Sequence, residues 1–149
     1  MAEILFYHLT ERTLEETLPG LVEKSLERGW KVVVQSGVEE RLETLDAHLW
    51  TWRDDSFLPH GRRRDGTEAM QPVFLTTEDD NPNGANVRFM VDGAEPPDLS
   101  DYLRGIYLFD GHDEEAVVHA RTRWKAEKEA GHDVTYWQQS PQGRWEKKA

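Results

Sequence analysis

The first fifty residues alternate between two hydrophobic periods. Residues 4–7 and 30–35 are short apolar runs rich in β-branched and aromatic side chains, which predicts two buried strands. Between these runs leucines recur at helical spacing, so a helix is expected there. Thr10 or Thr13 is expected to cap the start of this helix, and Gly29 its end.

A second helix is expected directly after the second strand. Ser36 is a candidate N-cap with Glu39 at the third helical position, as in a capping box, and Leu42, Leu45 and Leu49 form an apolar stripe. Strand, helix, strand and helix within about 50 residues are typical of right-handed βαβ units, which build a parallel sheet.

The rest of the chain continues this pattern. Further strands are expected at residues 73–75, 87–90 and 105–109, followed by a long helix at residues 114–130 that Gly131 ends. The predicted fold class is therefore α/β: a single-domain, Rossmann-like three-layer sandwich with a mostly parallel central sheet flanked by helices.

Length and composition agree with one domain. With 149 residues, of which 37% are hydrophobic, the chain is long enough to bury a full core. The expected domain covers residues 1–135. Residues 136–149 are expected to form a C-terminal tail that packs on the domain or is mobile.

Charge changes the expected class of partner. The net charge is −11, which argues against a dedicated nucleic-acid binder because phosphates are repelled. The charge is unevenly distributed: residues 1–115 carry 11 basic and 25 acidic side chains, whereas residues 116–149 carry 7 and 4. An acidic body of net charge −14 is thus followed by a basic segment of net charge +3, which indicates either a partner site or an ordinary basic last helix.

The sequence lacks the motifs of several common kinds of catalytic and binding site. There is no cysteine, no glycine-rich phosphate loop and no GxSxG elbow, and the histidines show no metal-binding spacing. The acidic cluster at residues 110–114 and the pair Asp54 and Asp55 are weak candidates for a metal and for acid–base catalysis. We expect no catalytic residue, no metal and no cofactor. Without a signal peptide or membrane-spanning apolar run, a cytoplasmic protein is expected.

Two segments carry a specific resemblance. Residues 45–60 (LDAHLWTWRDDSFLPH) resemble the signature of the chi subunit of bacterial DNA polymerase III holoenzyme, in which a helix ending in Leu-Asp-x-x-Leu-Trp precedes a Ser-Phe-[Leu/Val]-Pro-His stretch. Residues 120–131, with Arg-x-Arg-Trp-Lys and a closing glycine, resemble the last helix of that family. The resemblance covers about residues 1–135.

The resemblance implies a bacterial, replisome-associated accessory subunit of a DNA-directed DNA polymerase, not a catalyst. Chi belongs to the clamp-loader assembly and has no polymerase activity of its own. It bridges the small psi subunit, where one is present, and the acidic, Phe-ending C-terminal tail of the single-stranded-DNA-binding protein. Contact with DNA would then be only indirect.

The last predicted helix carries the candidate site for that tail. Arg121, Trp124, Lys125 and Lys128 are spaced so that they share one helix face, which suits an acidic peptide ending in an apolar residue. By resemblance, Arg121 and Trp124 match the chi positions that hold the tail, and Lys128 matches a further basic position. The alternative is that Trp124 belongs to the core and the cations only suit the end of the helix.

The sequence departs from the family at one position of that site. Val117 stands where some chi proteins place another basic residue. Affinity for the tail is therefore either lower here or supported by Arg123, Lys147 and Lys148.

Trp50, Phe57, Pro59 and His60 match the chi surface that meets psi. A tryptophan, a phenylalanine and a proline close together also suit a protein interface with psi or another clamp-loader subunit. The alternative for Trp50 is that it closes the apolar stripe of its helix as a core residue.

Two other functions compete with this hypothesis. A direct single-stranded-DNA-binding module would use the arginines at 62–64 and the basic C-terminus, against the charge of the acidic body. A nucleotide-dependent enzyme on a Rossmann-like fold would need the glycine loop that is missing.

Overall fold

One eight-stranded sheet forms the centre of the molecule. The computed structural model describes residues 2–50, 61–62 and 72–149. In the described chain the strand order is β3-β4-β2-β5-β6-β1-β7-β8, and every neighbouring pair is parallel except β7 and β8. The expected mostly parallel α/β sheet is confirmed.

In the described chain the elements follow one another in the order βαβαββββαββ. The strands are β1 (Glu3–Leu9), β2 (Val32–Ser36), β3 (Gly61–Arg62), β4 (Val73–Thr76), β5 (Val87–Val91), β6 (Arg104–Asp110), β7 (Asp133–Gln139) and β8 (Trp145–Lys147). The helices are α1 (Leu14–Glu27), α2 (Arg41–Trp50) and α3 (Glu114–Glu129).

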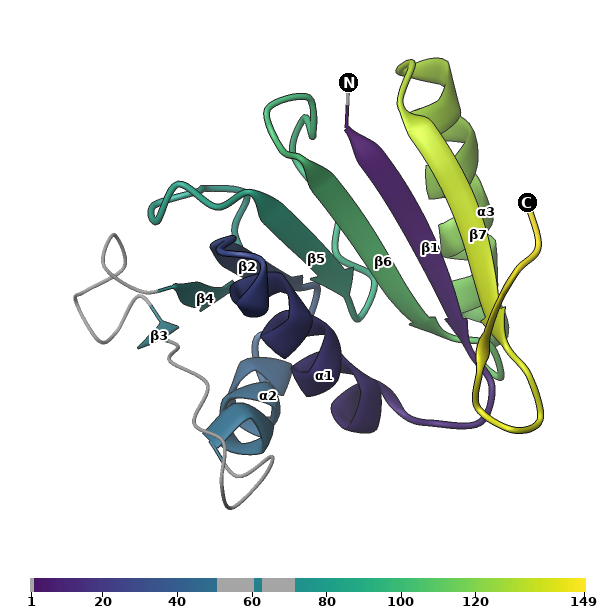
Figure 1. The fold of residues 1–149 in the computed structure, drawn as a ribbon, viewed down its shortest axis with the longest axis horizontal. Coiled ribbons are helices and arrows are strands. Elements are labelled where there is room, and N and C mark those ends of the chain that lie inside the picture. Colours follow the sequence, from purple (N-terminus) through teal and green to yellow (C-terminus); the bar gives the residue numbers. More distant parts are fainter. Residues whose placement is uncertain (1, 51–60, 63–71) are drawn as a thin grey trace.

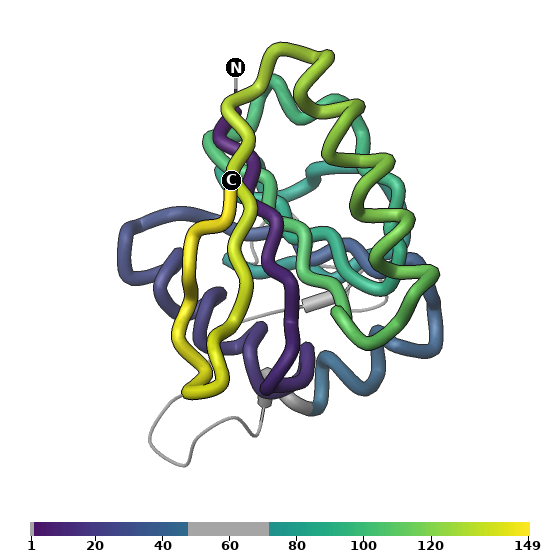
Figure 2. The backbone as a smooth tube through the Cα atoms, turned by 90° about the vertical axis from the view of Figure 1, so that its right-hand side faces the viewer, coloured from purple at the N-terminus to yellow at the C-terminus, as the bar shows by residue number. Residues whose placement is uncertain are grey.

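Helices cover both faces of the sheet. Figure 2 shows α1 and α3 on opposite sides of the strands, and Figure 1 shows α1 and α2 in front of them. Leu18 and Val22 of α1 and Leu45 of α2 belong to one buried apolar cluster, whereas Ala120 of α3 belongs to a second cluster on the other face. The molecule is thus a three-layer sandwich.

Side-chain caps fix where two of the helices begin. Thr13 caps α1 in a capping box with Glu16, which selects Thr13 over Thr10. Asp113 caps α3, because its carboxylate accepts from the backbone N–H groups of Glu115 and Ala116. The start of α3 at Glu114, as expected, therefore places the basic residues that follow on known helical positions.

The expected cap of α2 at Ser36 is wrong. Ser36 is the last residue of β2, and α2 begins only at Arg41. The Ser36 hydroxyl accepts from the backbone N–H of Val38 at 3.1 Å and lies 3.0 Å from Asp92 Oδ2. The hydroxyl is therefore occupied by the turn after β2 and by the loop after β5.

The C-terminal residues add two strands that the sequence pattern did not indicate. β7 pairs in parallel with β1, and β8 pairs antiparallel with β7. The expected boundary between residues 135 and 136 falls inside β7. In the part of the chain that the structure describes, no helix is long and apolar enough to cross a membrane.

Candidate functional site

The exposed face of α3 carries the predicted basic residues. Arg121, Lys125 and Lys128 are all solvent-exposed, and their spacing places them on neighbouring turns of one helix face. Arg121 and Lys125 also line a shallow groove beside Val118, which is 59% exposed. The structure therefore brings Arg121 and Lys125 together next to an apolar side chain that solvent can reach.

Trp124 lies between the core and this surface. Its ring is half-buried and packs edge-on against Phe6 and Tyr136, with ring centres 5.5 and 5.8 Å away. The Nζ atom of Lys128 lies 4.9 Å from the centre of the indole ring, within cation–π distance. Trp124 thus combines the two alternatives, because one part of the ring supports the core while another remains accessible.

Tyr136 and His8 border the same site, although the sequence pattern did not single them out. Tyr136 contacts Trp124, and its hydroxyl lies 2.6 Å from His8 Nδ1. Burial raises the pKa of Tyr136, against the opposing effect of the Arg121 charge. Burial also lowers the pKa of His8, with smaller contributions that include Arg121. The guanidinium of Arg121 therefore acts on both rings.

The pairing of distant strands explains why these two rings meet. β1 pairs with β7 so that His8 lies opposite Gln138, two positions along from the pair of Phe6 and Tyr136. A strand pairing across about 130 residues has no signature in local periodicity. The only sequence signal was the aromatic content of the tail, at Tyr136 and Trp137.

Arg123 does not belong to the exposed basic face. Its Nε donates to the Tyr107 hydroxyl at 3.1 Å, and its guanidinium pairs with Glu127 at 3.3 Å and Glu95 at 3.5 Å. Val117 is half-buried and packs against the same apolar cluster as Trp124. Arg123 is therefore engaged elsewhere, and Val117 adds an apolar rather than a basic side chain beside Arg121.

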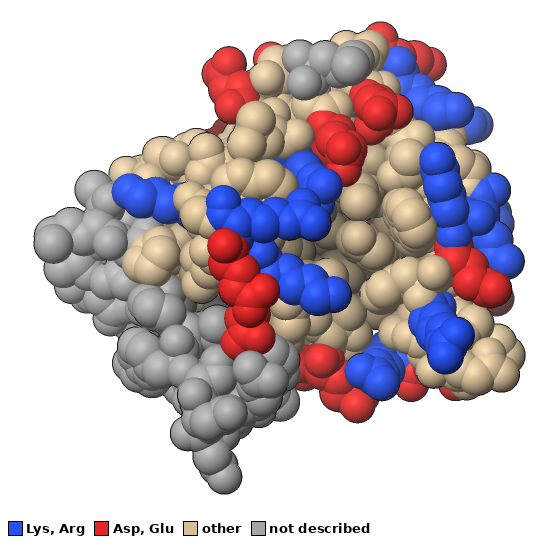
Figure 3. Space-filling view, viewed as in Figure 1, with Lys and Arg blue, Asp and Glu red and all other residues tan. Residues whose placement is uncertain are grey.

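The C-terminal cations lie at the neighbouring edge of the sheet. Lys147 and Lys148 are exposed, and Lys148 pairs with Glu146 at 3.7 Å. The backbone N–H of Lys148 donates to the Tyr136 carbonyl at 2.8 Å, so this segment runs beside β7. Figure 3 shows basic side chains at this right-hand edge, with acidic side chains beside them.

The second predicted surface lies largely outside the described residues. Trp50 is the last residue of α2, whereas Phe57, Pro59 and His60 fall outside the part of the chain that the structure describes. The same holds for Asp54 and Asp55.

Two carboxylates of the acidic cluster at residues 110–114 hydrogen-bond to the nearby backbone. Asp113 caps the helix, and Asp110 Oδ1 accepts from the His112 backbone N–H at 2.8 Å. Within residues 2–50, 61–62 and 72–149, no group of three or more potential ligands is placed to hold a metal ion.

Comparison with known proteins identifies the family. The sequence model of the DNA polymerase III chi subunit, HolC, matches residues 1–135. A curated relative, the probable DNA polymerase III subunit chi of Rickettsia prowazekii (strain Madrid E), is 30% identical over 104 residues. That match covers 70% of this chain but 61% of the relative, so the alignment spans less than two thirds of the relative's length. The predicted resemblance is confirmed: the chain belongs to the DNA polymerase III chi subunit family.

Proposed function

We propose that this chain is a non-catalytic adaptor of DNA polymerase III that links the clamp loader to the acidic C-terminal tail of the single-stranded-DNA-binding protein. Membership of the chi family supports a place in the polymerase assembly. The observation that carries the proposal is the face of α3 and β7, where exposed cations surround a partly accessible indole ring. We call the set Arg121, Trp124, Lys125, Lys128 and Tyr136 the α3–β7 face.

The chemistry of this face matches the two ends of such a tail. Arg121 can grip the terminal carboxylate with two hydrogen bonds, a geometry that lysine cannot supply. Lys125 and Lys128 attract the acidic residues that precede it. The phenyl ring of a final Phe can pack against Trp124 and Val117, both of which are half-buried at the surface of the core.

The link to the clamp loader is assigned to Trp50, Phe57, Pro59 and His60. These residues match the family's psi-binding signature, and an apolar and aromatic set suits a protein interface. Co-purification with psi or another loader subunit tests this assignment. Replacing Phe57 with Ala is expected to abolish co-purification while binding of the acidic tail is retained.

The tail site is tested by calorimetric titration. The probe is a peptide of about eight residues that is rich in Asp and ends in Phe with a free carboxylate. Arg121→Ala is expected to weaken binding about tenfold or more, because a charge-assisted bidentate contact is lost. Arg144→Ala, which removes an exposed cation from the turn between β7 and β8, is the matched control and is expected to leave the affinity within about twofold.

Two further sets of titrations, at rising salt and with altered peptides, separate a specific site from simple charge attraction. Binding should weaken as salt rises, and it should also be lost when the terminal carboxylate is amidated or the final Phe is removed. If Arg121→Ala and Arg144→Ala weaken binding equally, or if the amidated peptide binds as well as the acid, the α3–β7 face is not the tail site.

A further inference from the structure

A second candidate site lies at the carboxyl ends of the central strands. A cavity of about 770 Å³ opens there between the N-terminal ends of α1 and α3. Its walls include Leu9 at the end of β1 and Leu108 and Phe109 in β6. The size falls within the range of about 300–1,000 Å³ that is usual for ligand pockets.

The topology of the sheet creates this cavity. β1 and β6 are neighbours, but the chain leaves β1 for α1 on one face and leaves β6 for α3 on the other. The two helices therefore diverge from adjacent strand ends and leave a crevice between them. In open α/β sheets, ligands bind in the crevice at such a switch point.

The inner wall of the cavity is apolar. Leu9, Met90 and Leu108 line it, and each is almost fully buried. Val38, before α2, lies at the same cavity and is 42% exposed. An apolar side chain entering from outside would thus meet Val38 first, in front of the buried apolar wall.

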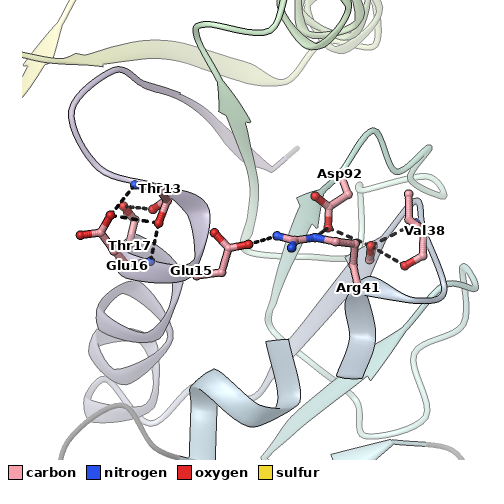
Figure 4. A network of polar contacts seen from close by, with 8 residues as sticks. Thr13, Glu15, Glu16, Thr17, Val38, Arg41 and Asp92 are labelled. Carbon is pink, nitrogen blue, oxygen red and sulfur yellow. Dashed lines mark hydrogen bonds and ion pairs between the residues drawn. The ribbon is translucent and has the colours of Figure 1, made fainter. Parts of the chain in front are cut away.

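The rim of the cavity is acidic. Six carboxylate residues line it in the described chain: Glu11, Glu15, Asp92, Asp110, Asp113 and Glu115. Arg12 and Arg41 are the two described residues with guanidinium groups that line it, so the formal charge of these side chains is −4. Arg41 is engaged with Glu15 and with Asp92 at 3.2 Å, which ties α2 to α1 and to the loop after β5 (Figure 4).

One buried nitrogen at the wall lacks a partner. The Nε2 atom of His119 is buried and has no hydrogen-bond partner among the described residues, whereas Nδ1 faces Glu95 Oε1 at 3.4 Å. With a proton on Nδ1, Nε2 is an acceptor.

Anionic ligands do not fit this rim. The N-termini of α1 and α3 would favour a phosphate by their dipoles, but Glu15, Glu16 and Asp113 already occupy these ends. The remaining carboxylates would repel a nucleotide. The charge and the apolar wall therefore both favour a ligand that is cationic and partly apolar.

We propose that this cavity docks a short basic segment of a partner protein, with an apolar side chain against the exposed side chain of Val38 and a Lys or Arg at the acidic rim. The site is separate from the α3–β7 face, because Arg121, Lys125 and Lys128 do not line it. The inference therefore does not depend on binding of the acidic tail.

The test uses a synthetic probe and the full chain. The probe is acetyl-Leu-Lys-Leu-Arg-Leu-Lys-amide, titrated into ¹⁵N-labelled protein and into a calorimeter cell. Glu11→Lys with Glu115→Lys reverses two exposed rim charges. Asp101→Lys with Asp133→Lys makes the same change in total charge at the opposite end of the strands, where β6 and β7 begin.

The rim double variant is expected to weaken binding about tenfold, and the control double variant less than about twofold. Shifted amide signals are expected at the ends of β1 and β6 and at the start of α3. Val38→Thr, which nearly keeps the side-chain volume but adds a hydroxyl, is expected to weaken binding by a few-fold.

The proposal is overturned if the probe does not bind, if both double variants weaken it equally, or if the shifted signals map elsewhere. It is also overturned if ADP or the acidic counterpart acetyl-Leu-Glu-Leu-Glu-Leu-Glu-amide binds the cavity instead. Arg121→Ala should bind the basic probe as well as the unchanged protein does. Loss of basic-probe binding and loss of acidic-tail binding are thereby distinguished, so each proposal can be overturned without the other.

Discussion

Buried polar side chains connect the sheet to its loops. Arg88 of β5 is fully buried, yet its guanidinium donates to Gln35 Oε1 at 2.7 and 2.9 Å, to Tyr102 and to the carbonyl oxygens of Glu78 and Asp80. A buried cation is tolerated when its donors are matched in this way. Arg88 thereby fixes the course of the loop between β4 and β5.

A second buried network lies under α3. The side chain of Glu127 is 7% exposed and contacts Arg123 and the Tyr107 hydroxyl. Burial raises the pKa of Glu127, although Arg123, His132 and Tyr107 act in the opposite direction. Burial also raises the pKa of Tyr107. The folded protein therefore holds a proton on Glu127 to a higher pH than the unfolded chain does.

This shift predicts a pH dependence of stability. Because the pKa of Glu127 is raised on folding, its contribution favours folding below the ordinary value of 4.5 and is lost as pH rises through the folded pKa. Glu127→Gln removes that loss. Relative to the unchanged protein, the free energy of unfolding of this variant is expected to improve as pH rises above the ordinary value of 4.5 and through the raised pKa of the folded state, as measured by urea denaturation.

Glu129→Gln serves as the control for Glu127→Gln, because Glu129 is exposed on the same helix. Its stability curve should run parallel to that of the unchanged protein. Parallel curves for Glu127→Gln as well would show that the buried carboxyl does not titrate differently in the folded state.

At the residue scale, the sequence predicted only part of the candidate site. The spacing of Arg121, Lys125 and Lys128 was sufficient, because helical geometry places such residues on one face. The contribution of Tyr136 and His8 could not be predicted, since it depends on the pairing of β1 with β7. The orientation of the Arg123 guanidinium could not be predicted either, because it donates to Tyr107, which belongs to a different element.

At the scale of elements, apolar runs located the central strands and helical spacing located the helices. β2, β4, β5 and most of β6 are buried throughout, and fully buried strands show as continuous apolar runs. β7 is half-buried along most of its length and reads DVTYWQQ, which has no such run. The cavity could not be predicted either, because loops after several strands together form it.

The capping box of α1 is expected to be worth about 1 kcal/mol. Thr13 Oγ1 accepts from the Glu16 N–H at 3.2 Å, and the Glu16 carboxylate accepts from the Thr13 N–H at 3.1 Å. Thr13→Ala should lower the free energy of unfolding by about that amount, whereas Thr13→Ser should retain most of it. Urea denaturation measures both, and equal losses for the two variants would contradict a role for the hydroxyl.

At the scale of the whole molecule, charge is divided between two regions. Residues 1–115 carry a net charge of −14, and a basic surplus of +3 lies in residues 116–149, which form most of α3 and both C-terminal strands. The sequence predicted this division, and the structure places an acidic cavity at one end of α3 and exposed cations along it. The two proposed sites thus attract ligands of opposite charge.

This division predicts weak contact with bare DNA. A fluorescent single-stranded oligonucleotide should bind with a Kd weaker than about 100 µM at physiological salt, because the acidic body repels phosphates. The same oligonucleotide coated with single-stranded-DNA-binding protein should retain the chain, and removal of that protein's C-terminal tail should release it. Micromolar binding to the bare strand would instead favour a direct DNA-binding module.

The last strand of the chain also affects how the molecules behave in concentrated solution. β8 is only three residues long, and its Glu146 and Lys147 are exposed next to Lys148. Long, apolar edge strands template pairing with other chains, whereas short and charged ones resist it. Because β8 returns antiparallel beside the end of β7, a short charged strand and not the aromatic one forms this edge of the sheet, which disfavours edge-to-edge association of molecules.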